Sequence, residues 1–274
     1  MSNADNPSVV FFEGEPKGEI HSMTLSACIS ALVAACETDR VNIIQLEYIK
    51  YTKGWHHEAI LVELQEVDAD AATPRKAYAL IDRDADCPTA KKTYFSSSPS
   101  LSSQARHDVR LSRDKDAFTT SSDRYEVQRH IDSITYSWPF IQLLVAASVV
   151  AKAKPRYNPF TAHCYWYAGS IWDVAVLHLQ KVWSNGWEMA VHGSRAVPAR
   201  GFAREAFAKF EGAWMELETD IKKWRQDKRE KDSRVAFRDG VLAGSKVGAQ
   251  EKEDLKRQNA ALEARLRLLE ARQG

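Results

Sequence analysis

The 274-residue sequence has few cysteines, no excess of either charge and no close cluster of cysteine and histidine. Its four cysteines are scattered without a CxxC pair, which argues against a structural zinc site. Lysine and arginine number 38 against 37 aspartates and glutamates, so the formal net charge is only +1. Such a balanced chain does not attract a polyanion as a whole. We therefore expect no metal, no cofactor and no nucleic-acid partner.

The sequence also lacks the segments that would direct a chain into or across a membrane. Residues 1–20 contain no basic flank followed by an apolar stretch, as a secretory signal would. The most apolar run starts at Trp138 and reaches Lys152 before the roughly 20 residues that a membrane span requires. We expect a flexible N-terminus over 1–20, no transmembrane segment, and a cytoplasmic location with reduced thiols.

Apolar residues make up 44% of the chain and aromatic residues 10%, which is enough for a folded core. Their spacing predicts an amphipathic helix over 23–37 and a helix or helix pair over 125–153, with Pro139 as its start or kink. Three short β-branched or aromatic runs predict strands at 41–49, 56–64 and 76–84. The predicted fold class is α+β.

The composition shifts between residues 95 and 124 to serine, aspartate, arginine and threonine. This segment includes the stretch SSSPSLSS, in which a single leucine stands among serines and a proline, too few apolar side chains to form a core. We expect a disordered insertion about 95–124, within a domain that spans residues 21–190.

The stretch NPFTAHCYWYAGSIWDV, residues 158–174, places Cys164 near the start of a predicted helix. Thr161 is the expected N-cap, which puts Cys164 in the first turn. Unpaired amides and the helix dipole lower the pKa of a thiol there, and the resulting thiolate is a nucleophile. A cysteine among aromatic rings is also typical of a packed core. Both interpretations, nucleophile and core residue, stay open at this point.

A cysteine nucleophile needs a base and a group that orients the base. His57 begins a predicted strand, and the small Ala59 lies on the same face, where a helix could pack closely. Asp82 ends the next predicted strand, so a hairpin would bring it beside His57. A shift of one residue in register would put His56 in place of His57. A solvated strand end would explain Asp82 equally well.

These motifs, in this order, resemble the circularly permuted papain-like thiol hydrolases and acyltransferases, the lecithin:retinol acyltransferase group in particular. Residues His57 to Val62 fit the H-x-A-I-x-V strand of that group position for position. The stretch LIDR places Asp82 where the group carries a second histidine, and HCYWYAG has His163 where asparagine is usual. The sequence is also similar to a group of uncharacterised fungal proteins with comparable strands and an N-C-Y-W-F-A helix start. The resemblance covers about residues 40–185.

The resemblance implies a papain-like domain, with a small antiparallel sheet packed on the helix that carries Cys164, and nucleophilic catalysis. In that case Cys164 attacks an acyl or amide carbonyl, His57 takes its proton, and Asp82 holds the imidazole. The implied substrates are a peptide, an isopeptide or a lipid ester. The alternative is a non-catalytic scaffold on a degenerate papain-like fold, whose C-terminal helices do the work by assembly.

Two heptad-like patterns follow the predicted domain. The first spans 200–239 and repeats large apolar residues, namely Phe207, Phe210, Trp214, Leu217, Ile221 and Trp224. The glycines at 240, 244 and 248 are expected to break the helix. The second spans 250–274, with Leu255, Leu262 and Leu269 in one position and Asn259 and Leu266 in the other. We expect self-association or a helical protein partner through residues 203–274, although a helix folded back on its own domain fits the same pattern.

Overall fold

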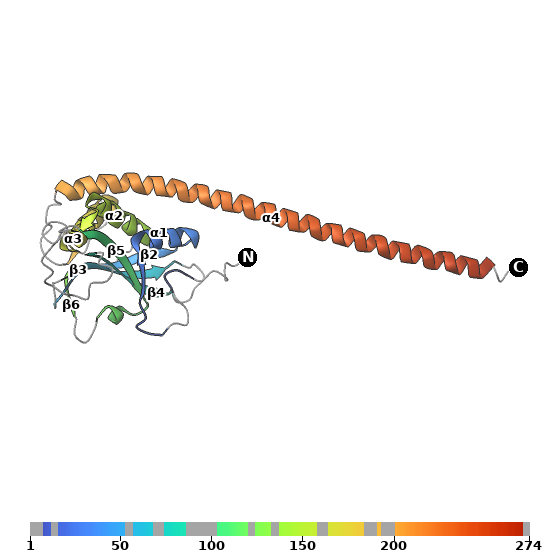
Figure 1. Ribbon diagram of the computed structural model, residues 1–274, viewed down its shortest axis with the longest axis horizontal. Helices are drawn as coiled ribbons and strands as arrows, with labels where there is room; N and C mark the ends of the chain where they lie inside the picture. Colours follow the sequence, from blue (N-terminus) through green and yellow to red (C-terminus); the bar gives the residue numbers. More distant parts are fainter. Residues whose placement is uncertain are drawn as a thin grey trace. The chain divides into compact units, whose positions relative to one another are not determined.

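The protein is described by a computed structural model, whose α+β chain forms one antiparallel sheet with helices (Figure 1). The structure describes residues 8–11, 16–52, 57–67, 74–85, 103–119, 124–132, 137–157, 164–183, 191–192 and 201–270. The predicted α+β class is confirmed.

The sheet has the strand order β1-β5-β4-β3-β2-β6-β8, with the short β7 paired to β5, and every pairing is antiparallel. The strands are β1 His21–Thr24, β2 Val41–Tyr51, β3 Glu58–Glu66, β4 Lys76–Ala85, β5 Ser103–Ser112, β6 Tyr125–Ile131, β7 Arg156–Tyr157 and β8 Val191–His192. The three strands predicted from residue patterns are confirmed as β2, β3 and β4.

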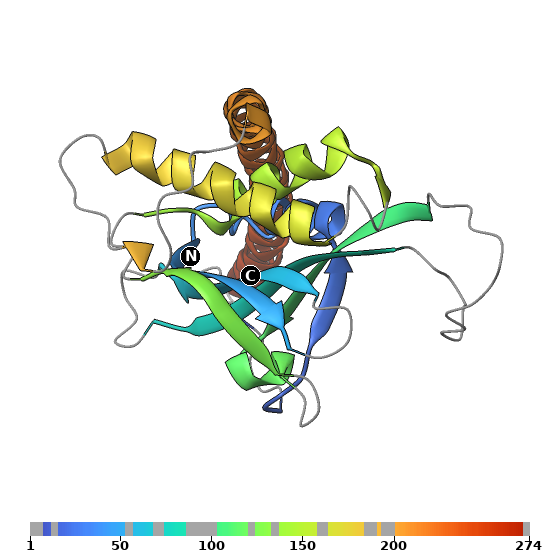
Figure 2. The same ribbon diagram turned by 90° about the vertical axis from the view of Figure 1, so that its left-hand side faces the viewer.

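Three helices lie over one face of the sheet, and a 3₁₀ helix lies on the other (Figure 2). They are α1 Leu25–Ala34, α2 Phe140–Ala153 and α3 Cys164–Trp183, with the 3₁₀ helix η1 at Lys115–Phe118. Helix α2 begins directly after Pro139, because proline fits the start of a helix and not its interior. The predicted start at Pro139 is therefore confirmed.

Side-chain alternation along the strands separates the two faces. Ile60 and Tyr48 are paired across β3 and β2, and Tyr48 contacts Trp172 of α3 with ring centroids 6.1 Å apart. The opposite face carries a buried cluster of Ile49, Tyr51, Ala59, Leu61, Leu80 and Phe118. Helix α3 thus packs on the face opposite to Ala59, so the expectation that the helix carrying Cys164 would pack on the Ala59 face is wrong.

Two of the segment predictions between residues 95 and 131 are corrected by the structure. Strand β5 and η1 lie within 103–119, inside the predicted disordered insertion. Val109 and Leu111 are fully buried at alternate positions, and β5 pairs with β4 and β1. This alternation was hidden by the polar composition of the segment. Residues 125–131, predicted as helical, form β6 because they pair with β2.

Part of the N-terminal stretch predicted to be flexible is packed onto the domain. Val10 and Phe11 are buried, and the Val9 amide donates a hydrogen bond to the Glu37 carboxylate. The guanidinium of Arg75 lies 5.3 Å from the centroid of the Phe11 ring. Two apolar side chains and a cation–π contact hold these residues, so the prediction of flexibility is wrong for 8–11.

A single helix, α4, spans Gly201–Glu270. It continues through the glycines at 240, 244 and 248, where a break was predicted. Each glycine costs about 1 kcal/mol relative to alanine but keeps its backbone N–H donor, unlike proline. The chain divides into two compact units, Met1–Glu216 and Leu217–Gly274. Among the described residues, no helix is both long and apolar enough to cross a bilayer.

Arg83 on β4 ties the sheet to the segment that precedes α3. Its side chain is fully buried and donates hydrogen bonds of 2.6 Å and 2.9 Å to the carbonyls of Lys154 and Arg156. It also lies over the rings of Trp166 and Tyr167 on α3. A buried cation is tolerated there because carbonyls and π faces replace its water.

Replacing Arg83 with methionine should lower the free energy of unfolding by about 2 kcal/mol, because two buried carbonyls lose a charged donor. Urea unfolding followed by far-UV circular dichroism measures this change. The control is Lys76→Met, since Lys76 is exposed and forms only a surface ion pair with Glu63. Equal stability of the Arg83→Met protein and the wild type would contradict this role for Arg83.

Candidate active site

The structure brings together the three residues proposed from the sequence. Cys164 is the first residue of α3, His57 immediately precedes β3, and Asp82 lies on β4. The His57 Nε2 atom is 3.4 Å from Asp82 Oδ2, and the His57 side chain is also hydrogen-bonded to the Cys164 thiol. The imidazole therefore bridges the carboxylate and the sulfur.

The three residues meet at the end of the strands and not beneath the helix. Ile60 is paired with Ile81, so Asp82 lies opposite Ala59, the second residue of β3. Because side chains alternate along a strand, Asp82 points to the face opposite to α3. Because Cys164 is at the very start of α3, it reaches His57 at this edge. The ring of Tyr51, from the buried cluster, lies beside His57 with centroids 6.1 Å apart.

Two opposing influences act on the Cys164 thiol. Burial disfavours the thiolate, whereas the hydrogen bond and the charge of His57 favour it, as do the backbone amides of Glu58 and Tyr165. The favourable contacts outweigh burial, so the pKa of the Cys164 thiol is lowered below its ordinary value. Cys28 shows the contrast, because it is fully buried without such partners and burial raises its pKa to about 12. The thiolate character of Cys164 therefore comes from its neighbours.

His57 and Asp82 stabilise each other as an ion pair. Burial disfavours the imidazolium, yet the hydrogen bonds and charges of Asp82 and Cys164 outweigh it and raise the pKa of His57 to about 10. Burial likewise disfavours the Asp82 carboxylate, but His57 and Arg110 lower its pKa below the ordinary value. His57 thus links the Cys164 sulfur to the Asp82 carboxylate, and its positive charge favours the ionised form of both groups.

Arg110 on β5 is a site residue that sequence reasoning missed. Its guanidinium donates to Asp82 Oδ2, and the ladder pairs Leu80 with Arg110, two residues from Asp82. The residue lies within the segment predicted to be disordered, where a polar composition hides the alternation of the strand. That alternation, with Val109 and Leu111 facing inward, was the signal that could have found it.

Glu58, the variable position of the H-x-A-I-x-V motif, also belongs to the site. Its side chain is buried, accepts a hydrogen bond from the Tyr48 hydroxyl and lies 3.7 Å from the Lys50 ammonium. Burial raises the pKa of Glu58 to about 7, against the opposing charge of Arg129. Its amide contacts the Cys164 sulfur while its carboxylate points the other way.

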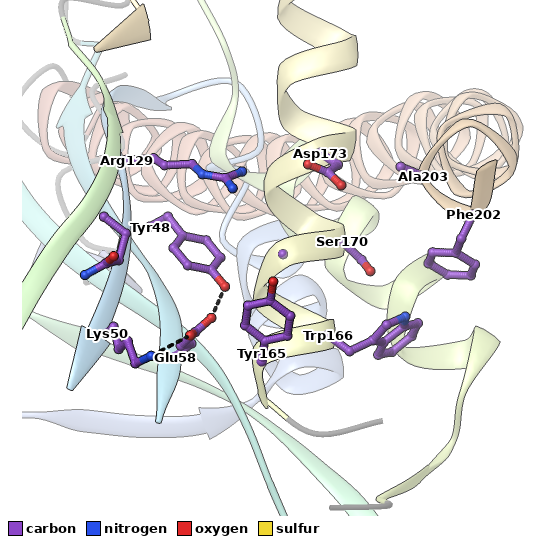
Figure 3. A pocket seen from close by; sticks show the side chains of 12 residues that line it. Tyr48, Lys50, Glu58, Arg129, Tyr165, Trp166, Ser170, Asp173, Phe202 and Ala203 are labelled. Atoms are coloured by element: carbon purple, nitrogen blue, oxygen red, sulfur yellow. Dashed lines mark hydrogen bonds and ion pairs between the residues drawn. The ribbon is translucent and has the colours of Figure 1, made fainter. Parts of the chain in front are cut away.

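A pocket of about 380 Å³ lies on the α3 side of Glu58 (Figure 3). Strands β2, β3 and β6 form one wall, and the first turns of α3 and of α4 form the others. Glu58 and Tyr165, whose amides contact the sulfur, both line it. We call this space the α3 pocket. Cys164 is not among its lining residues, so Glu58 and Tyr165 are the link between the pocket and the sulfur.

Several residues weighed in the sequence analysis lie outside the described residues. They are His56, Thr161 and His163. Among the described residues, His57 is the histidine that contacts both Asp82 and Cys164. The choice of His57 over His56 therefore rests on an observed contact.

Comparisons with protein-family models, with curated proteins and with solved structures found no match for this chain. The chemistry of the site is consequently argued from its own geometry.

We predict that at pH 7 His57 is an imidazolium while His178 is neutral, because burial lowers the pKa of His178 to about 4. Asp82→Asn should lower the pKa of His57, since the hydrogen-bonded negative charge is lost. Nitrogen-15 NMR of labelled histidine measures both rings, and His178 is the internal reference. A His57 ring that is neutral at pH 7 in the wild type would contradict the ion pair.

Proposed function

We propose that the protein is a cysteine-dependent hydrolase or acyltransferase that acts on an amide, isopeptide or ester bond through a thioester. The observation that carries this proposal is the contact of His57 with both the Cys164 thiol and the Asp82 carboxylate. A nucleophile, a base and an orienting carboxylate in this order are the requirements of covalent acyl transfer. We further propose that the domain is a permuted papain-like fold, supported by the antiparallel sheet and the cysteine that begins α3.

In the first step the Cys164 thiolate attacks the carbonyl carbon of the substrate, and a carbon–sulfur bond forms as the carbonyl oxygen becomes an oxyanion. Backbone N–H groups at the start of α3 would stabilise this oxygen. The tetrahedral intermediate then collapses, the bond to the amine or alcohol breaks, and the leaving group takes a proton from the His57 imidazolium. The acyl group remains on sulfur as a thioester.

In the second step His57, now neutral, takes a proton from water, an amine or an alcohol, which attacks the thioester carbon. Collapse of the second intermediate breaks the carbon–sulfur bond and regenerates the thiolate and the imidazolium. Asp82 holds the imidazole in one tautomer in both steps and stabilises its cationic form. Arg110 would keep Asp82 ionised and in place.

The alkylation rate of Cys164 by iodoacetamide, measured against pH by mass spectrometry of its peptide, tests the proposal. The rate should rise with a midpoint below the free-thiol value of about 8.5 and then stay level, because the thiolate–imidazolium pair persists until His57 loses its proton. His57→Ala should shift the midpoint above about 8.5, since burial then acts on the thiol without a compensating cation.

The matched control is Cys28 in the same digest, whose buried thiol should be alkylated slowly at every pH in both proteins. Slow alkylation of Cys164, indifferent to the His57 substitution, would sink the proposal.

The second candidate function is a scaffold that assembles through α4. Leu255, which begins the leucine pattern of residues 250–274, is 59% exposed on this helix, and an exposed leucine on a heptad pattern favours a helical partner. Of the possible partners, a second copy is favoured by the leucine spacing with Asn259 in the complementary position.

Sedimentation velocity of the full chain should show a concentration-dependent dimer, and the double change Leu255→Glu and Leu262→Glu should make it a monomer. Two buried charges would cost the dimer several kcal/mol. Lys256→Glu, outside the leucine positions, is the matched control and should leave the dimer intact. A monomer at all concentrations in the wild type would exclude self-association.

A further inference from the structure

The α3 pocket carries charged side chains that the acyl-transfer steps do not use. Glu58 is one of them, but its carboxylate is already engaged by the Tyr48 hydroxyl and by Lys50. Asp173, on α3, also has an interaction partner. Neither carboxylate is therefore the group that most needs a ligand.

Arg129 differs from these acids. It is paired with Tyr48 across β6 and β2, and its guanidinium carbon lies 5.7 Å from the centroid of the Tyr48 ring. Among the described residues no carboxylate lies within ion-pair distance of its guanidinium, although its charge acts on the Glu58 carboxylate. Figure 3 shows its side chain extending from β6 toward α3, above Tyr48.

Stacking on an aromatic ring uses the face of a guanidinium and leaves its N–H groups free in the plane. Those N–H groups form the fork that binds a carboxylate through two parallel hydrogen bonds. Tyr165, which follows Cys164 and is 45% exposed, lines the same pocket, and its amide contacts the Cys164 sulfur.

We propose that the α3 pocket selects acyl groups that carry a carboxylate near the reacting carbonyl, with Arg129 as the residue that binds this carboxylate. Lys50 also lines the pocket, but its ammonium is paired with Glu58, which leaves Arg129 as the cation for the ligand. This inference rests on the proposed function, because it concerns the acyl group that Cys164 would accept.

The test uses three chloromethyl ketones, derived from N-acetylglutamate, N-acetylglutamine and N-acetyllysine, which alkylate an active-site thiol. The rate of labelling of Cys164 is measured by mass spectrometry and divided by the iodoacetamide rate of the same protein. The glutamate probe should label about tenfold faster than the glutamine probe, which has the same shape without the charge. The lysine probe should be slowest.

Arg129→Gln should reduce the glutamate-to-glutamine ratio to about one, and Arg129→Lys should keep part of it, since lysine retains the charge but not the fork. Arg124→Gln is the matched control: Arg124 is an exposed arginine beside β6, and the wild-type ratio should persist. Thermal unfolding of each variant confirms that it is folded.

The outcomes separate the two proposals. An alkylation rate of Cys164 whose pH midpoint is not below the free-thiol value of about 8.5 would count against the proposed function itself. Normal iodoacetamide alkylation with equal rates for the glutamate and glutamine probes would overturn only the carboxylate inference. A faster lysine probe would also overturn it, because Glu58 and Asp173 would then set the preference. Persistence of the wild-type ratio in folded Arg129→Gln would remove Arg129 from the assignment.

Discussion

The carboxylate of Asp82 is the interaction on which the site depends. It is almost completely buried, and a buried carboxylate stays ionised only if cations replace the water it has lost. His57 supplies one such cation and Arg110 the other. Because the imidazolium in turn stabilises the Cys164 thiolate, the charge on one strand residue sets the protonation of all three side chains.

The fold places Cys164, His57 and Asp82 at the ends of the strands, so these side chains are not needed for the packing of α3 on the sheet. Helix α3 packs on one face of the sheet, while Asp82 lies on the other with the cluster that contains Tyr51, Leu61 and Phe118. Only the first residue of α3 can reach around the strand ends. The sulfur therefore lies between the strand ends and the start of α3, and its neighbours Glu58 and Tyr165 also line the α3 pocket.

Residue patterns predicted most of this region because the patterns there are strong. The strands β2, β3 and β4 alternate or are continuously apolar, and the identity of Cys164, His57 and Asp82 followed from their places at element ends. Arg110 and β5 were missed because a polar composition hid the alternation of Val109 and Leu111. The helical assignment of 125–131 failed because strand pairing with β2 is a tertiary interaction that local spacing does not encode.

Arg129 and the α3 pocket could not be read from the sequence for a related reason. The pocket is made by five elements, and Arg129 acquires its setting only when β6 pairs with β2 and Tyr48 comes opposite. The continuity of α4 through its glycines shows the reverse case. The predicted break gave the three glycines too much weight, because the helix propensity that they lose is small beside the backbone hydrogen bonds of a long helix.

Asp82 and Arg83 are adjacent on β4 but serve opposite faces of the sheet. The first holds the imidazolium, and the second is buried against α3 and the carbonyls of Lys154 and Arg156. If β4 slipped by one residue, an arginine would meet His57 and an aspartate would be buried against those carbonyls. The first change would bring two positive charges together, and the second would bring a carboxylate against carbonyl oxygens. The neighbouring Asp82 and Arg83 therefore favour the native register of β4 electrostatically. The same two residues that equip the site thus also discriminate the native pairing of the sheet from its nearest misfolded alternative.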